Sequence, residues 1–159
     1  MTALGWAAAA LLASAPPAAE PPSLTAWHGS WVGEGEAFGK PATATLEIAP
    51  GEGGATMLSY RLSIERTPPV AYSAEATYAV DAKGRVGGKW TDSTGRTRAV
   101  AGGVNAAKWW THWGSADVEI GRSTYVLDES GRLLVSDSVL QDDGSWRVFA
   151  VLRYTRKNP

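Results

Sequence analysis

Apolar and polar residues alternate along most of the chain after Leu24, with the period of two that is typical of half-buried β-strands. The alternation is clearest in residues 42–48 and 58–64, which are separated by a Pro- and Gly-rich break. No segment shows the sustained period of 3.6 that is typical of an amphipathic helix. Together with an opening strand at Trp31, the later strands are expected at 72–81, 85–92, 96–102, 109–113, 118–127, 133–140 and 145–155. The pattern predicts an all-β protein of about ten strands.

Short turns join these expected strands. Lys83-Gly84, Thr94-Gly95, Glu129-Ser130-Gly131 and Asp142-Asp143-Gly144 have the residues that hairpin turns favour. Consecutive hairpins predict an antiparallel up-and-down meander, and closing it into a barrel would remove the two exposed edge strands. An open sandwich is the alternative, although its Greek-key connections are usually longer. The regular spacing favours the single barrel.

The N-terminal segment has the features of a secretory signal peptide. An apolar run from Leu4 to Ala13 is followed by small residues and by Pro16-Pro17. The run is too short to span a membrane, which takes about 20 residues. We therefore expect cleavage after Ala15 or Ala19, with 1–23 as signal peptide and Pro-rich lead and 24–157 as the barrel domain. The mature protein would then be periplasmic or secreted; a disordered Ala-rich leader is the alternative.

Composition narrows the classes of function. The 159 residues carry a net charge of −1 at pH 7, which gives no basic surface for nucleic acid. There is no Cys, so disulfides and Cys-ligated zinc are excluded. No catalytic triad, phosphate-binding Gly loop or metal-ligand cluster is recognisable. The eight Trp need either a core or a ligand to pack against.

Both ends of the expected barrel carry residues of a known type of fold. Gly29-Ser30-Trp31 at the start and Leu152-Arg153-Tyr154-Thr155-Arg156 at the end resemble the closing strands of calycin barrels, which include lipocalins, fatty-acid-binding proteins and nitrobindin-like haem barrels. The likeness is closest to secreted bacterial barrels of unknown function. The resemblance implies that Trp31 plugs one end, with Gly29 beside it, and that Arg153 packs over the Trp31 ring.

Two departures limit what the resemblance implies about a ligand. Fatty-acid-binding proteins hold a carboxylate with Arg-x-Tyr, whereas Arg153 and Tyr154 are adjacent here and point to opposite faces of a strand. Nitrobindin-like barrels have a haem-binding His late in the chain, but no His follows His112. Haem would therefore need a different geometry, and the cofactor stays open.

Four residues are candidates for contact with a ligand. Trp90 shares a strand face with two small residues, Val86 and Gly88, which would leave room in a cavity. Trp110 and His112 share another face and could form a pocket with a stacking ring and an imidazole. In the alternative interpretation both lie on the outer wall, because Trp109 and Trp113 occupy the opposite face of the same strand.

Arg61 is the fourth candidate and lies on a polar strand face with Ser59 and Ser63. If its side chain points into the barrel, it could neutralise an anionic ligand. An unpaired buried guanidinium is costly, however, so the outward position is favoured.

These observations predict an exported barrel, monomeric or weakly dimeric, that holds a small hydrophobic or amphipathic ligand, lipid-like or haem-like, in an aromatic-lined cavity. Two alternatives stay open. One is an enzyme that uses His112 as general base on a hydrophobic substrate. The other is a structural envelope protein whose barrel is filled by its own side chains.

Overall fold

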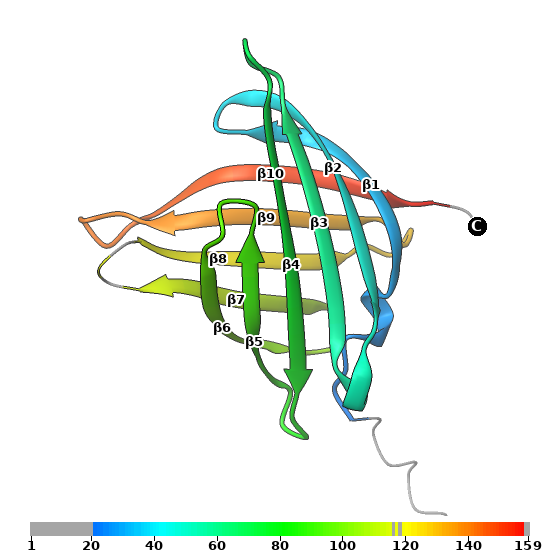
Figure 1. Ribbon diagram of the computed structural model, residues 1–159. Coiled ribbons are helices and arrows are strands. Elements are labelled where there is room, and N and C mark those ends of the chain that lie inside the picture. Colours follow the sequence, from blue (N-terminus) through cyan, green and yellow to red (C-terminus); the bar gives the residue numbers. More distant parts are fainter. Residues whose placement is uncertain (1–20, 116, 118, 158–159) are drawn as a thin grey trace, which may run out of the picture.

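The computed structural model describes residues 21–115, 117 and 119–157, which form a closed antiparallel barrel. Each strand pairs with its neighbours in sequence, and the first strand closes the barrel by pairing with the last, so that the order is β1-β10-β9-β8-β7-β6-β5-β4-β3-β2. In Figure 1 the upright strands β2–β5 cross the nearly level strands β7–β10. The predicted all-β up-and-down barrel is confirmed, and the open sandwich is wrong.

The described residues form ten strands and two short 3₁₀ helices. The helices are η1 (Thr25–Trp27) and η2 (Glu52–Gly54), and neither is long and apolar enough to cross a membrane. The expected signal peptide and Val118 fall on residues outside the described part of the chain. The strands are β1 (Gly29–Ala37), β2 (Lys40–Pro50), β3 (Thr56–Ile64), β4 (Val70–Val80), β5 (Arg85–Asp92), β6 (Thr97–Val104), β7 (Lys108–Ser115), β8 (Glu119–Leu127), β9 (Leu133–Leu140) and β10 (Trp146–Arg156).

Four hairpins use one local turn chemistry. Each ends on a glycine with φ between 76° and 82°, a left-handed conformation that favours Gly. In three of them an Asp at the first turn position accepts a hydrogen bond from the backbone N–H two residues later, which fixes the turn. The turns are Asp81–Gly84, Asp92–Gly95, Asp128–Gly131 and Gln141–Gly144. These are the positions at which the sequence predicts turns.

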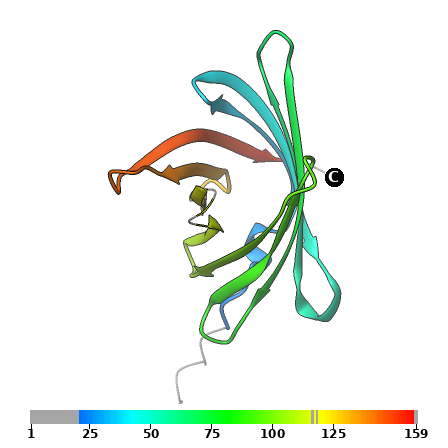
Figure 2. The same cartoon turned by 60° about the vertical axis from the view of Figure 1, so that its left-hand side comes forward.

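One end of the barrel is filled by large apolar side chains. Trp109 is fully buried and stacks on Tyr125 with ring centroids 4.1 Å apart. Tyr78 packs edge-on against the same indole at 5.0 Å. The short helix η1 covers this end (Figure 2). It adds Trp27, whose ring lies 6.3 Å from that of Trp109. We call this region the closed end.

The closure between the first and last strands differs from the expectation in one residue. Trp31 is fully buried and its indole N–H donates to the backbone oxygen of Trp27 at 3.0 Å. The guanidinium above its ring belongs to Arg156, 4.2 Å from the ring centroid, and not to Arg153. Arg156 is the register partner of Trp31, whereas Arg153 lies opposite Glu34 and is exposed.

Arg156 also ties η1 to the barrel. Its two terminal nitrogens donate to the backbone oxygens of His28 and Ala26. The expectation for Arg153 was wrong because Arg156 lies three positions further along the strand, and an odd offset places the two arginines on opposite faces.

Candidate ligand-binding site

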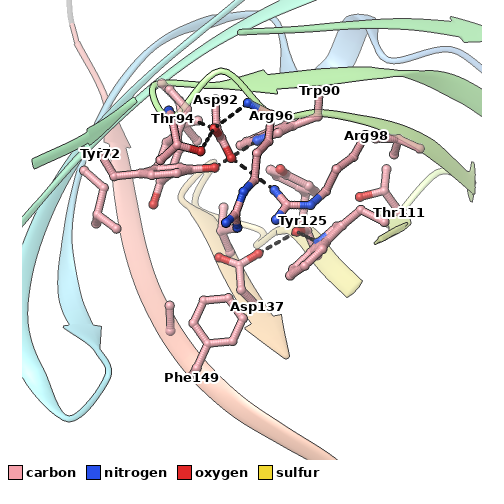
Figure 3. Close-up of a pocket in the computed structure, with 18 of the residues that line it drawn as sticks. Tyr72, Trp90, Asp92, Thr94, Arg96, Arg98, Thr111, Tyr125, Asp137 and Phe149 are labelled. Atoms are coloured by element: carbon pink, nitrogen blue, oxygen red, sulfur yellow. Dashed lines mark hydrogen bonds and ion pairs between the residues drawn. The ribbon is translucent and has the colours of Figure 1, made fainter. Parts of the chain in front are cut away.

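A cavity of about 310 Å³ occupies the end of the barrel opposite Trp31. Strands from both sides of the barrel contribute to its wall, and Figure 3 shows most of the lining side chains. The lining is mainly apolar and aromatic, with a few polar groups. The lining residues are Phe38, Leu46, Tyr60, Leu62, Ile64, Val70, Tyr72, Tyr78, Trp90, Asp92, Thr94, Arg96, Arg98, Val100, Thr111, Trp113, Glu119, Ser123, Tyr125, Val135, Asp137, Phe149, Ala150 and Tyr154.

Three aromatic side chains from neighbouring strands form one wall. The Trp90 indole N–H donates to the Tyr72 hydroxyl at 3.0 Å. The Tyr60 ring centroid lies 6.0 Å from that of Trp90 and 6.1 Å from that of Tyr72. These contacts hold the rings in a fixed arrangement while each keeps part of its surface accessible. The wall can therefore pack against an apolar ligand without rebuilding itself.

The opposite wall depends on a bulge in β10. The pairing of β10 with β9 shifts between Val148 and Ala150, and Phe149 lies at the shift. Phe149 consequently lines the cavity next to Ala150, and its ring stacks on Phe38 at 4.9 Å.

Trp113 completes this wall. A Cβ atom at Gly121 would collide with its indole, so the glycine is what allows the ring to lie across β8.

The mouth of the cavity carries an ion pair. Arg98 donates to Asp92 at 3.1 Å, and its other terminal nitrogen lies 3.9 Å from Glu119. Burial alone would raise the pKa of Asp92, but hydrogen bonds from Thr94 and Arg96 and the Arg98 guanidinium outweigh it and hold this pKa below its usual range. Both charges of the pair are therefore satisfied within the protein.

Asp137 carries a second carboxylate into the cavity wall. It accepts a hydrogen bond from the Ser123 hydroxyl at 2.5 Å, and that hydroxyl in turn accepts one from the Trp113 indole N–H at 3.2 Å. Among the described residues, no Lys, Arg or His nitrogen lies within 4.0 Å of it. Burial raises the pKa of Asp137 to about 6, although the bond from Ser123 acts in the opposite direction.

Tyrosine hydroxyls supply most of the other polar atoms. Burial raises the pKa of every tyrosine in the lining, and the nearby Asp137 charge adds to the effect. These hydroxyls remain neutral over the whole physiological range and can donate or accept hydrogen bonds. The cavity is thus an aromatic chamber with neutral hydroxyls, one satisfied ion pair and one carboxylate without a cationic partner.

The structure separates the four candidate residues of the sequence analysis. Trp90 lines the cavity. Trp110 and His112 lie on the outer face of β7, because the side chains of that strand that point into the barrel are those of Trp109, Thr111 and Trp113. The interpretation that places both on the outer wall is the one the structure supports.

Trp110, His112 and Arg61 have different surroundings on the outside of the barrel. Trp110 lies over Gly103 with Lys108 5.9 Å from its ring, and the exposed His112 ring lies 6.1 Å from Trp146. Arg61 is exposed in an open depression of the outer face, between β2 and β4. None of the three lines the cavity: Arg61 has the outward position that its sequence pattern favours, and Trp110 and His112 have the outer-wall position of the alternative interpretation.

The sequence analysis did not identify Asp137 or the tyrosines as lining residues. A signal for Asp137 was present, since it continues the apolar alternation of Leu133 and Val135, the residues of β9 that face inward. A carboxylate at a strand position whose alternation places it inside the barrel indicates a functional site more strongly than an aromatic residue of unknown orientation.

The chemistry of the arrangement suits binding. The described residues contain no cluster of three His, Asp, Glu or Cys that could hold a metal ion. Both histidines lie outside the cavity lining, so a haem placed there would have no histidine ligand from the described residues. His28 sits near the closed end, where its ring contacts the Thr56 hydroxyl at 3.2 Å.

No protein-family model matches this chain, and no curated protein matches its sequence.

Proposed function

We propose that the protein is an exported carrier that holds one small amphipathic molecule in the cavity of the barrel. The observation that carries this proposal is the cavity itself: about 310 Å³, enclosed by aromatic and aliphatic side chains, with a small number of polar groups. Ligand sites of soluble proteins have this composition and begin at about 300 Å³. The filled-barrel alternative applies only to the closed end.

Burial of apolar surface would supply the affinity. Removing apolar surface from water contributes about 25 cal/mol per Å², and the rings of Tyr60, Trp90 and Trp113 offer such surface at fixed positions. The hydroxyls and Asp137 would orient the polar end of the ligand. The resemblance to calycin barrels, the expected signal peptide and the monomeric or weakly dimeric state remain part of the proposal.

The alternative of an enzyme with His112 as base loses its support. His112 is exposed on the outer face and does not line the cavity, so a substrate inside the barrel could not reach its imidazole.

A titration with a simple neutral amphipath tests the proposal. We expect 4-phenylbutan-1-ol to bind with 1:1 stoichiometry in isothermal titration calorimetry and to change the tryptophan fluorescence, because Trp90 and Trp113 line the cavity. Val135→Phe should reduce the affinity, since Val135 lines the cavity and the larger ring would occupy it.

The same substitution at Val148 is the matched control, because Val148 is exposed on the outside and lies at the shift in β10 rather than in the lining. If Val135→Phe does not fold, Val70→Trp replaces it, because Val70 lines the mouth and is 40% exposed. Absence of binding by the unmodified protein, or equal losses in the cavity and control variants, would overturn the proposal.

A further inference from the structure

We propose that the ligand of this cavity is an organic cation, an amine carried on an apolar body, with Asp137 as its counter-ion. The inference rests on the proposed function and names the class of ligand. It follows from the contrast between the two carboxylates that line one cavity, and from the charges around them.

Asp92 is satisfied by the protein. Its carboxylate accepts hydrogen bonds from the Thr94 hydroxyl and backbone N–H and from the Arg96 backbone N–H, and it pairs with Arg98 (Figure 3). A ligand could gain little from this group, because its oxygens already have partners.

Asp137 is not satisfied in this way. Its hydrogen bond from Ser123 reaches one carboxylate oxygen, and among the described residues no donor is within hydrogen-bonding distance of the other. Asp137 is partly buried, and a carboxylate that loses part of its hydration without gaining a cation is costly. A ligand ammonium group would supply the missing charge and the missing donors together.

Among the described residues, no cation near the mouth forms an ion pair with Asp137. Arg98 is committed to Asp92 and Glu119, and its guanidinium also lies 5.7 Å from the Trp113 ring. Arg96 is exposed, and none of its guanidinium nitrogens comes within 4.0 Å of a carboxylate of the described residues. The lining therefore contains three acidic residues against two basic ones, which disfavours an anionic ligand.

The aromatic wall suits the same class of ligand. Cations are attracted to the faces of Trp and Tyr rings, most strongly when water is excluded. Trp113 is linked to Asp137 through Ser123, so a ring and a carboxylate are held together by hydrogen bonds. Trp90, Tyr60 and Tyr72 add further ring surface in the same cavity.

The ionisation of Asp137 gives the test a pH dependence. Its pKa, raised to about 6 by burial, leaves it largely ionised at pH 7.5 and largely protonated at pH 5. The tyrosines that face it have raised pKa values and stay neutral at both, while Asp92 has a lowered pKa and stays ionised. The charged groups at the mouth are Asp92, Arg96, Arg98 and Glu119.

Three matched ligands test the inference by calorimetry at pH 7.5: 4-phenylbutylamine, 4-phenylbutan-1-ol and 4-phenylbutyrate. The expected order of affinity is amine, alcohol, acid, with the amine at least about tenfold tighter than the alcohol. Asp137→Asn should abolish the preference for the amine, so that the ratio of the amine and alcohol affinities falls to about one. Asp142→Asn, in the exposed turn before β10, is the control and should change nothing.

The outcomes separate this inference from the proposed function. Binding of the alcohol without a preference for the amine, or a preference that survives in Asp137→Asn, would overturn the cation site and leave the cavity intact. Failure of all three ligands would overturn both. If Asp137→Asn does not fold, the unmodified protein at pH 5 decides, since the amine should then lose affinity several-fold and the alcohol should not.

Discussion

The two ends of this barrel are built from the same kinds of residue but differ in how fully they are packed. The closed end is filled by side chains, whereas the opposite end, which we call the hollow end, contains the cavity. At the closed end Trp27, Trp31 and Trp109 are all at most 1% exposed and pack against one another or against tyrosines. At the hollow end Trp90 and Trp113 keep accessible surface and border a cavity. Apart from Trp27, which lies in η1, both sets point inward by the same alternation of strand residues.

Two differences explain the contrast. The closed end is covered by η1, which brings Trp27 and the buried Leu24 against the barrel, whereas the described residues place no helix over the hollow end. Small residues line the hollow end, among them Ala150, Thr111 and Ser123, and they leave unfilled volume.

The indole N–H groups of the two ends also differ in whether they have hydrogen-bond partners. At the hollow end Trp90 and Trp113 donate to a tyrosine and a serine hydroxyl. At the closed end the N–H groups of Trp27 and Trp109 are buried without a partner among the described residues. Packing thus dominates where the barrel is closed, while polar placement dominates where it is open. Binding sites are expected in the second kind of region.

The largest expected effect comes from removing a ring at each end. Trp31→Ala should lower the free energy of unfolding by about 3–5 kcal/mol, because the deleted indole is fully buried and leaves a void. Trp90→Ala should cost about 1–2 kcal/mol, since that ring already borders open volume. Urea unfolding monitored by far-ultraviolet circular dichroism measures both, and equal costs would contradict the division into two ends.

The second effect concerns the carboxylate of the hollow end. The folded state raises the pKa of Asp137 from 3.8 to about 6, so it binds a proton more tightly than the unfolded chain does. The contribution of this group to stability is then fully present below pH 4 and is lost as the pH rises through 6. The loss amounts to at most about 3 kcal/mol.

Asp137→Asn should remove this pH dependence and should be more stable than the unmodified protein at pH 7.5. Thermal unfolding at pH 4, 5, 6 and 7.5 would measure it, with Asp142→Asn as the control. A variant that is less stable at pH 7.5 would show that the carboxylate has a partner within the protein.

A smaller effect distinguishes the two arginines of the last strand. Arg156→Ala should lose about 1–2 kcal/mol, because it removes the cation above Trp31 and the hydrogen bonds to His28 and Ala26. Arg153→Ala should stay within about 0.5 kcal/mol, as exposed substitutions usually do. The difference in urea midpoint between the variants is the measurement, and a larger loss at Arg153 would reverse the assignment.

The fold was predictable because its signals are local and repeated. The alternation in 42–48 and 58–64 and the Gly-containing hairpin turns each indicate strand or turn without knowledge of the rest. Closure then follows from the need to pair the two edges, and β1 pairs with β10 along seven residue positions.

The site was less predictable because it depends on which face of each strand points inward. In β7 both faces carry tryptophan, so the alternation alone does not show which face points into the barrel. The phase is set by contacts from other strands: Trp109 packs on Tyr78 and Tyr125, and a glycine in β8 makes room for Trp113. A bulge adds a further uncertainty, since the shift at Phe149 cannot be read from the alternation in β10.

The smallest expected effect therefore tests the outer face. His112→Ala should leave the affinity for 4-phenylbutan-1-ol within about twofold, because the imidazole is exposed and lies against Trp146 rather than in the cavity. Trp90→Ala, measured by the same calorimetry, should weaken that affinity by about tenfold through lost ring contact. A His112 effect as large as that of Trp90 would place the ligand on the outer wall of β7. The cavity would then be a packing defect of the hollow end and not the binding site.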